Sequence, residues 1–323
     1  MLVSCLFVLI GLILLVYGAD VFVVGAASAA RRLGMPPLII GLTIVGFATS
    51  APEIIVGSVS AWQGKTAIAI GNALGSNITN IGLVLGISVI LLPLPVASST
   101  LKREYALMCV SIIIALVLMF DDYLSRYDGA ILLFALVLAI GWIIWIAKQS
   151  KPDDPLKSEF TEELKVTDSL GKASLKLVIG LSLLLVGAEV LVRGAVSIAE
   201  YYGVSDLVIG LTIVAIGTSL PELAASIASL IKKEADIAIG NIIGSNMFNM
   251  LAVLGIPALI HPDSVENAVL TRDFPAMIGL TLLLGTMVFM TDKGKLIRSE
   301  GALLLLCFCA YQYVLYTQGI AES

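Results

Sequence analysis

The sequence predicts an all-α polytopic membrane protein with ten transmembrane helices, arranged as two inverted five-helix repeats. Of its 323 residues, 59% are hydrophobic and only 13% are charged, which is far too apolar for a water-soluble domain. Apolar runs of the roughly 20 residues that a bilayer crossing needs recur along the chain. The second half also repeats the first half at an offset of 169 residues, without a gap.

The apolar runs define the predicted crossings and the domain boundaries. A polar stretch from Lys148 to Lys172 separates two sets of five runs, so we expect a first repeat over residues 1–147, a linker over 148–173 and a second repeat over 174–323. The predicted crossings are 3–29, 38–62, 67–92, 104–121, 128–147, 174–199, 207–231, 236–260, 274–291 and 300–317.

The match between the halves indicates a duplication. At the common offset Gly180 falls on Gly11, and Pro221-Glu222 falls on Pro52-Glu53. Each repeat holds five helices, an odd number, so the second repeat must enter the membrane from the opposite side. This plan of inverted repeats is typical of secondary transporters.

Loop charges predict the orientation. The loops after the first, third, fifth, seventh and ninth crossings hold most of the lysines and arginines, and the positive-inside rule places these loops in the cytoplasm. We therefore expect a multi-pass protein of the cell inner (plasma) membrane, with a cytoplasmic linker and both termini outside. The basic residues of those loops are Arg31, Arg32, Lys102, Arg103, Lys148, Lys151, Lys157, Lys165, Lys172, Lys232, Lys233, Lys293, Lys295 and Arg298.

Two glutamates in apolar helices point to the chemistry. Glu53 lies in GLTIVGFATSAPE and Glu222 in GLTIVAIGTSLPE, each directly after a proline. A carboxylate in the bilayer centre costs about 2.5–3.5 kcal/mol on insertion scales. Two of them at matching positions require a cation or protons, and we expect them to share one cation site.

Neutral oxygen ligands surround these glutamates in the sequence. Hydroxyl residues stand three and four positions before each glutamate and share its helix face, and a serine and an asparagine four residues apart follow in each repeat. These residues are Thr49, Ser50, Ser76 and Asn80 in the first repeat and Thr218, Ser219, Ser245 and Asn249 in the second.

The prolines predict broken helices at this site. Pro52 cannot donate to the carbonyl of Ala48, and Pro221 cannot donate to that of Gly217. The helices should bend there and leave carbonyls near Gly46 and Ala215 free to coordinate.

The expected ligands are all oxygens, which suit hard cations. Calcium takes 6–8 oxygen ligands in flexible geometry. Two carboxylates balance one Ca²⁺ or two Na⁺, so one site could hold either load in turn, as exchange requires. The alternative is a purely structural role. In that case Ser and Thr would only pack the helices together, and the glutamates would form interhelical hydrogen bonds.

Other polar or small residues favour structural roles. Gly71, Gly75, Gly240 and Gly244 give G-x-x-x-G twice and should let the third and eighth helices approach the site. Glu189 and Arg193 are four residues apart and should pair with each other. Asp20 has no such local partner, because Val24 occupies the equivalent place.

The motifs resemble those of the sodium/calcium exchanger family of the cation/calcium antiporter superfamily, over nearly the whole chain. The family signature resembles G-T-S-x-P-E followed by G-N-x-x-G-S-N-x-x-N in both repeats. The second copy here runs from Gly217 to Glu222 and from Gly240 to Asn249, while the first copy departs at Ala48 and Ala51.

The resemblance implies a Na⁺/Ca²⁺ antiporter with no resident cofactor, whose Ca²⁺ and Na⁺ are substrates. Glu53 and Glu222 would bind both ions, Asn80 and Asn249 would line the centre, and the carbonyls of Gly46 and Ala215 would reach inward. Flanking Na⁺ sites would use Thr49, Ser50, Ser76, Thr218, Ser219 and Ser245. Some relatives carry aspartate at the position of Asn249, so asparagine here argues against K⁺ coupling. A monomer in the lipid bilayer should suffice for transport, and no nucleic-acid partner is expected.

Three alternatives remain open. A Ca²⁺/H⁺ antiporter on the same scaffold is the nearest one, because a buried glutamate can exchange a cation for a proton. A channel is a further alternative, although it does not require equivalent motifs in oppositely oriented repeats. An intramembrane enzyme is disfavoured, since the only histidine, His261, is predicted in an external loop, so a Ser–His dyad or a zinc centre has no base or ligand set.

Overall fold

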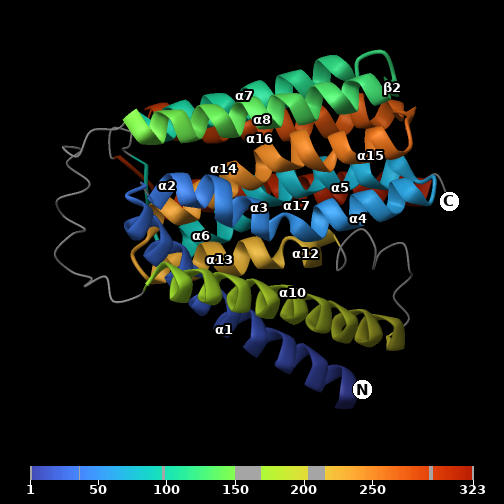
Figure 1. Cartoon of the computed structure of the whole chain (residues 1–323). Coiled ribbons are helices and arrows are strands. Elements are labelled where there is room, and N and C mark those ends of the chain that lie inside the picture. The colour runs from blue at the N-terminus through green and yellow to red at the C-terminus, as the bar shows by residue number, and fades with distance from the viewer. Residues whose placement is uncertain are drawn as a thin grey trace.

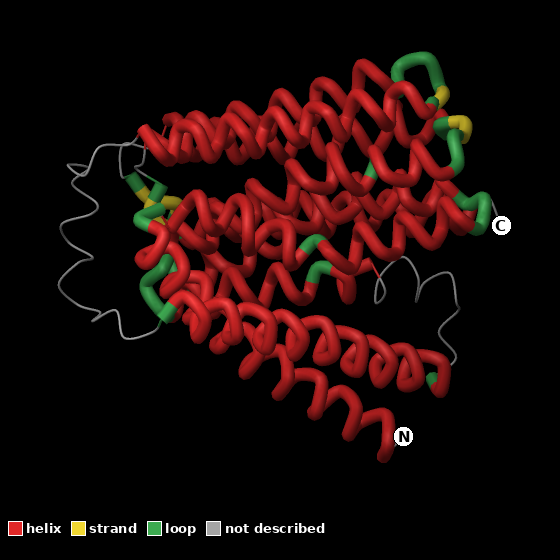
Figure 2. The backbone as a smooth tube through the Cα atoms, in the orientation of Figure 1, coloured by secondary structure: helices red, strands yellow, loops and turns green. Residues whose placement is uncertain are grey.

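The computed structural model describes residues 2–35, 37–96, 99–149, 169–202, 215–290 and 294–321, and these residues are almost entirely helical (Figure 2). Most helices run roughly along one common axis (Figure 1). The helices α7 and α8 form one outer layer, α10 and α1 form the opposite one, and α5, α14 and α16 lie between them (Figure 1).

The described helices overlap the predicted crossings as far as these are described, and several contain π-helical turns, labelled η. The first half has α1 Leu2–Leu33, α2 Pro37–Ile40, η1 Gly41–Val45, α3 Gly46–Thr49, α4 Ala51–Trp62, α5 Thr66–Thr79, η2 Asn80–Leu85, α6 Gly86–Leu91, α7 Ser99–Leu118 and α8 Arg126–Gln149. The second half has α10 Leu170–Tyr201, α12 Ala215–Thr218, α13 Leu220–Ile231, α14 Ala235–Phe248, η4 Asn249–Val253, α15 Gly255–Ile260, η5 Val269–Asp273, α16 Phe274–Met290 and α17 Arg298–Ala321.

Short strand pairs close both ends of the bundle. The strand β1 Leu94–Pro95 pairs antiparallel with β4 Lys295–Leu296, and β2 Tyr123–Leu124 pairs antiparallel with β3 Asp263–Ser264. The two pairs lie at opposite ends of the molecule (Figure 2).

Within the described ranges, seven helices are long and apolar enough to cross a membrane, and the bent pair Leu38–Thr49 and Ala51–Trp62 raises the number to eight. Part of the predicted crossing 207–231 lies outside the described residues, and its remainder contains the shorter helix α13. The protein is therefore a polytopic helical membrane protein, and the number of ten crossings stays a prediction.

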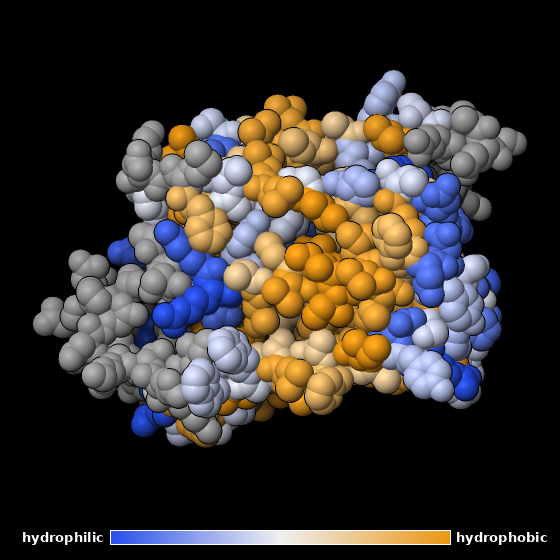
Figure 3. Space-filling view, turned by 90° about the horizontal axis from the view of Figure 1, so that it is seen from above, coloured by the Kyte–Doolittle hydropathy of each residue, from blue (hydrophilic) through white to orange (hydrophobic). Residues whose placement is uncertain are grey.

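Burial separates a central layer from a lipid-facing periphery. The most apolar window of Ala235–Ile260 is 89% buried, whereas that of Leu2–Leu33 is only 28% buried. A band of hydrophobic residues crosses the surface between two more polar ends (Figure 3). This band is what a bilayer would cover.

The peripheral helices α1 and α10 pack against each other along their length. A Cβ atom on Gly11 would lie 2.7 Å from the Gly187 carbonyl oxygen, and one on Gly18 would lie 3.1 Å from that of Gly180. Rising numbers on α1 thus meet falling numbers on α10, so the two helices are antiparallel. Close glycine contacts of this kind are a common means of packing membrane helices.

The chain ends and the middle of the chain lie at opposite ends of the bundle. The first turn of α1 and the last turn of α17 are at one end, while α8 ends and α10 begins at the other (Figure 1). Both termini are therefore on one side, and the connection between the halves starts and finishes on the opposite side.

Candidate cation site

The first repeat has a helix break directly before Glu53. The segments Leu38–Thr49 and Ala51–Trp62 meet at an angle of 42°, and Ser50 between them has φ −80° and ψ 4°. Pro52 is in the first turn of α4, where a missing N–H costs nothing. The predicted break is confirmed.

The second repeat breaks at the equivalent residue. Ser219 has φ −92° and ψ 6°, and α13 starts at Leu220 with Pro221 in its first turn. Glu53 and Glu222 therefore each lie in the first turn of a helix that begins inside the protein. In that position the positive end of the helix dipole favours a negative side chain.

Glycines bring the broken helix of the first repeat against α14. A Cβ atom on Gly240 would lie 2.5 Å from the Leu38 carbonyl oxygen, and one on Gly244 would lie 2.3 Å from that of Leu42. No side chain fits at either distance, so the second G-x-x-x-G pair does serve close approach to the site, as predicted. The segment equivalent to η1 in the second repeat lies outside the described residues.

Two π-helical turns begin at the predicted asparagine ligands. The turn η2 starts at Asn80 and η4 starts at Asn249, and both asparagines are 1% exposed. Turns of this type are rare in proteins overall, and those that do occur often lie at functional sites. The helical pattern of the sequence gave no sign of them.

Glu53 and Glu222 are buried next to each other. Both are 1% exposed, and the negative charge of Glu53 acts on Glu222. Hydroxyl groups of both repeats contact them: those of Ser76 and Thr218 contact the Glu53 carboxylate, and those of Thr49 and Ser245 contact the Glu222 carboxylate. The two glutamates therefore share one site built from both halves.

The hydroxyls also connect the repeats directly. The Thr49 hydroxyl donates to the Asn241 side-chain oxygen at 2.9 Å and lies 3.2 Å from the Ser245 hydroxyl. The Ser76 hydroxyl is 3.5 Å from a Glu53 oxygen. These contacts place oxygens from α3, α4, α5 and α14 in one buried cluster.

Six buried oxygens of this cluster have no hydrogen-bond partner. Leaving a buried polar atom unpaired costs on the order of 1–3 kcal/mol, so each such atom needs an explanation. Among the described residues, two further unpaired atoms, in Ser88 and Glu104, are not part of this set. The six atoms form three pairs related by the repeat offset: Ser50 and Ser219 Oγ, Glu53 and Glu222 Oε2, and Asn80 and Asn249 Oδ1.

Two carboxylates with neutral oxygens are a ligand set that suits a hard cation. Within the described ranges no group of three or more His, Cys, Asp or Glu side chains could hold a metal ion. A zinc-like site is therefore not an alternative in this part of the chain, and an ion here would be held by two charges and several neutral dipoles.

The predicted carbonyl ligands need a correction. The carbonyl oxygen of Gly46 is not free, because it accepts the Ser50 N–H at 3.1 Å and lies 3.4 Å from the Ser245 hydroxyl. The bend at Ser50 is shallow enough to keep this helical hydrogen bond, and a carbonyl oxygen retains a second lone pair. Ala215 is the first residue of its described segment, so its carbonyl stays a prediction.

Four further asparagines belong to the site and were not among the predicted ligands. The side-chain amides of Asn72 and Asn241 each lie 3.4 Å from the backbone carbonyl of the glutamate in their own repeat. Asn77 and Asn246 contact the ligand asparagines of the opposite repeat. The G-N-x-x-G-S-N spacing in both halves was the signal that could have found them.

Charged residues singled out in the sequence form two ion pairs outside the site. Arg193 Nε lies 2.5 Å from Glu189 Oε1, as the spacing predicted. Asp20 Oδ1 lies 2.5 Å from Lys232 Nζ, in the turn after α13, a partner that local spacing could not indicate. His261 caps α15 at the end of the bundle that holds β3, and its carbonyl accepts from Thr66.

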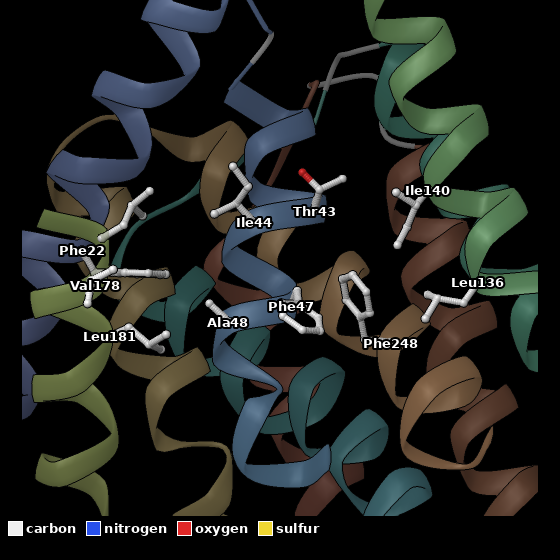
Figure 4. A pocket seen from close by; sticks show the side chains of 11 residues that line it. Phe22, Thr43, Ile44, Phe47, Ala48, Leu136, Ile140, Val178, Leu181 and Phe248 are labelled. Carbon is white, nitrogen blue, oxygen red and sulfur yellow. The ribbon is translucent and has the colours of Figure 1, made fainter. Parts of the chain in front are cut away.

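A separate cavity of about 490 Å³ lies on the outer side of α3 (Figure 4). Hydrocarbon side chains such as Phe22, Phe47 and Leu181 line it. Its one hydroxyl lining residue, Thr43, donates to the Ile39 carbonyl at 2.7 Å. None of these lining residues is a predicted cation ligand, so the cavity is separate from the oxygen cluster around Glu53 and Glu222.

Comparison with known families decides which proteins this chain is related to. The family model described as sodium/calcium exchanger protein matches residues 3–145 and 172–317. The chain belongs to the sodium/calcium exchanger family. The two matched segments correspond to the two halves that share the motif.

Relatives within this family match over almost the full chain. CaxA of Alkalimonas amylolytica, a provisionally named antiporter, is 49% identical over 98% of this chain and 100% of its own. The sodium/calcium exchanger MaX1 of Methanosarcina acetivorans is 30% identical over 97% and 99%. A structure of the sodium-calcium exchanger NCX_Mj superposes with a TM-score of 0.83 at 33% identity, over 97% of this chain and 99% of that one.

Membership of the exchanger family fixes the class of protein. The chain is a cation/calcium antiporter of the membrane and not an enzyme.

Proposed function

We propose that this antiporter exchanges Na⁺ for Ca²⁺ by alternating access at a mid-membrane site built on Glu53 and Glu222. The observation that carries the proposal is the set of six unpaired buried oxygens in three repeat-related pairs. Four of them are carboxylate and amide oxygens, which are hard ligands of the kind that Ca²⁺ takes.

The charges of the site account for exchange. Two buried carboxylates next to each other are unstable as a bare pair. One Ca²⁺ or two Na⁺ would neutralise them, so either load stabilises the same ligands and the two loads compete. Competition for one site is what couples the flux of one ion to the counterflux of the other.

Flanking hydroxyls give Na⁺ its own ligands. Ser76 lies beside Glu53, and Ser245 lies beside Thr49 and Glu222. A proton on a glutamate would need no such additional ligands, whereas further Na⁺ ions would. Because Asn249 is neutral, the site has only the two negative charges of Glu53 and Glu222. This disfavours coupling to K⁺ in addition to Ca²⁺ and Na⁺.

The contacts between the halves support ten crossings in inverted repeats. Equivalent helices α1 and α10 are antiparallel, and equivalent strands β1 and β3 belong to pairs at opposite ends of the bundle. Two copies related in this way would run through the membrane in opposite directions. The repeats would comprise residues 1–147 and 174–323.

The proposed location is the inner membrane, with the linker 148–173 in the cytoplasm and both termini outside. The basic loops favour this orientation. Both termini lie at the same end of the bundle, as this orientation requires (Figure 1). All six unpaired oxygens come from one chain, so a monomer would be sufficient for transport.

Flux measurements test the coupling ion. The purified protein is reconstituted in liposomes loaded with Na⁺, with K⁺ or at an acid pH, and radioactive Ca²⁺ uptake is followed. We expect uptake only into Na⁺-loaded liposomes. Uptake driven by the pH gradient and not by Na⁺ would replace the proposal with a Ca²⁺/H⁺ antiporter.

A further inference from the structure

We propose that Asn77 and Asn246 are positioning residues that hold the amide oxygens of Asn249 and Asn80 toward the bound cation. The inference rests on the proposed cation site. It adds hydrogen bonds that decide whether each of two amide ligands turns its oxygen or its nitrogen toward the cation. An asparagine amide has an oxygen and a nitrogen at nearly equal positions, and only the oxygen can bind a cation.

Asn77 is oriented by groups that can only accept. Its amide nitrogen lies 3.2 Å from the backbone carbonyl oxygen of Asn246 and 3.5 Å from the Met277 sulfur. Neither acceptor has a proton to donate, so the nitrogen of Asn77 must face them. Its Oδ1 atom is thereby turned toward Asn249.

The oxygen of Asn77 in turn orients Asn249. The Asn249 Nδ2 atom donates to Asn77 Oδ1 at 3.1 Å. With its nitrogen held there, the Oδ1 atom of Asn249 points the other way and is one of the six unpaired buried oxygens.

The second half repeats this arrangement with the roles exchanged. Asn246 Nδ2 lies 3.6 Å from the Met108 sulfur, and Asn80 Nδ2 donates to Asn246 Oδ1 at 3.1 Å. The Oδ1 atom of Asn80 is likewise buried and unpaired. Met108 and Met277, like the asparagines, are separated by the repeat offset.

The hydrogen bonds cross between the repeats, so each half orients the ligand of the other. Asn77 on α5 orients Asn249 in η4, and Asn246 on α14 orients Asn80 in η2. Without its partner, a ligand asparagine could rotate and present its NH₂ group, whose positive hydrogens repel a cation. Mutation of a residue that orients a metal ligand typically lowers metal affinity about 10- to 100-fold.

A set of double mutants tests the proposal, because a carboxylate presents oxygen in either rotamer and needs no orientation. Ca²⁺ affinity is measured by calorimetry on the purified full-length protein without Na⁺. We expect Asn77→Ala to weaken Ca²⁺ binding at least about tenfold in the parent. In the Asn249→Asp background the same substitution should change affinity little.

The matched control is the ligand that Asn77 does not contact. In the Asn80→Asp background, Asn77→Ala should keep its full cost, because Asn249 still needs orientation. The reciprocal set uses Asn246→Ala, which Asn80→Asp should rescue and Asn249→Asp should not. This set tests the same idea if Asn77→Ala is not recovered in folded form.

The outcomes separate this inference from the proposed function. A cost of Asn77→Ala that is the same in both aspartate backgrounds would reveal a merely structural role and overturn the inference. A negligible cost in the parent would overturn it as well. A parent that binds no Ca²⁺ would instead refute the proposed cation site.

Discussion

Replacing Glu222 with glutamine removes one charge from the proposed site and little else. Glutamine has nearly the same volume and keeps one side-chain oxygen, so the hydroxyls of Thr49 and Ser245 retain an acceptor. Glu222 is 1% exposed, and solvent cannot replace the lost charge. We expect Glu222→Gln to fold and insert normally and to lose exchange.

The expected loss follows from the cost of leaving a buried charge without its partner. Removing one member of a buried ion pair costs roughly 3–5 kcal/mol, and each 1.4 kcal/mol is about tenfold in affinity. Ca²⁺ binding should therefore weaken roughly 150- to 5,000-fold. Glu53→Gln should have a similar effect, because the two glutamates occupy equivalent positions.

Calorimetric Ca²⁺ binding and Na⁺-driven Ca²⁺ uptake into liposomes measure the loss. The matched control is Glu266→Gln, the same chemical change at an exposed residue after β3, which should leave both readouts at the parental level. Parental Ca²⁺ affinity and exchange in Glu222→Gln would refute the idea that the two glutamates share one cation.

Three further predictions concern coupling, orientation and stability. Ser76→Ala or Ser245→Ala should raise the Na⁺ concentration needed to drive Ca²⁺ uptake and lower the cooperativity of Na⁺. Ca²⁺ binding measured without Na⁺ should weaken much less. An unchanged Na⁺ dependence would exclude these hydroxyls as Na⁺ ligands. In a background without native cysteines, an impermeant thiol reagent added outside intact cells should label a cysteine at Glu266 and not one at Lys172, and the reverse pattern would invert the orientation. Burial raises the pKa of Glu234 despite its ion pair with Arg31, so its contribution to stability is present at low pH and is lost as pH rises through that raised pKa. The unfolding temperature in detergent should thus fall with rising pH in the parent more than in Glu234→Gln, and parallel pH profiles would contradict this.

The helix breaks could be predicted from the sequence because their cause is local. Pro52 and Pro221 lack an N–H group whatever the rest of the chain does, and the helices break at Ser50 and Ser219, just before these prolines. Burial of the two glutamates was predictable for a similar reason, since both lie in apolar segments that repeat.

The details that were missed depend on distant contacts. The partner of Asp20 is Lys232, in the turn after a helix whose position the sequence does not give. The Gly46 carbonyl is occupied because the bend leaves one helical hydrogen bond intact, and a proline alone does not specify the angle. The orientation of Asn80 depends on Asn246 in the other half of the chain.

The distribution of the unpaired oxygens explains why the site needs both halves. Each half contributes one hydroxyl, one carboxylate and one amide oxygen, and three oxygens cannot fill a Ca²⁺ shell of 6–8. One carboxylate would also leave a divalent ion half-neutralised in a medium that penalises net charge. Asn77 and Asn246 hydrogen-bond across the boundary, and in the proposed arrangement neither half alone would hold its own amide oxygen in place. A cation bound at the proposed site should therefore stabilise the packing of the two halves as well as the oxygens, and loss of the ion should loosen the contact between η2 and α14 before it loosens the periphery.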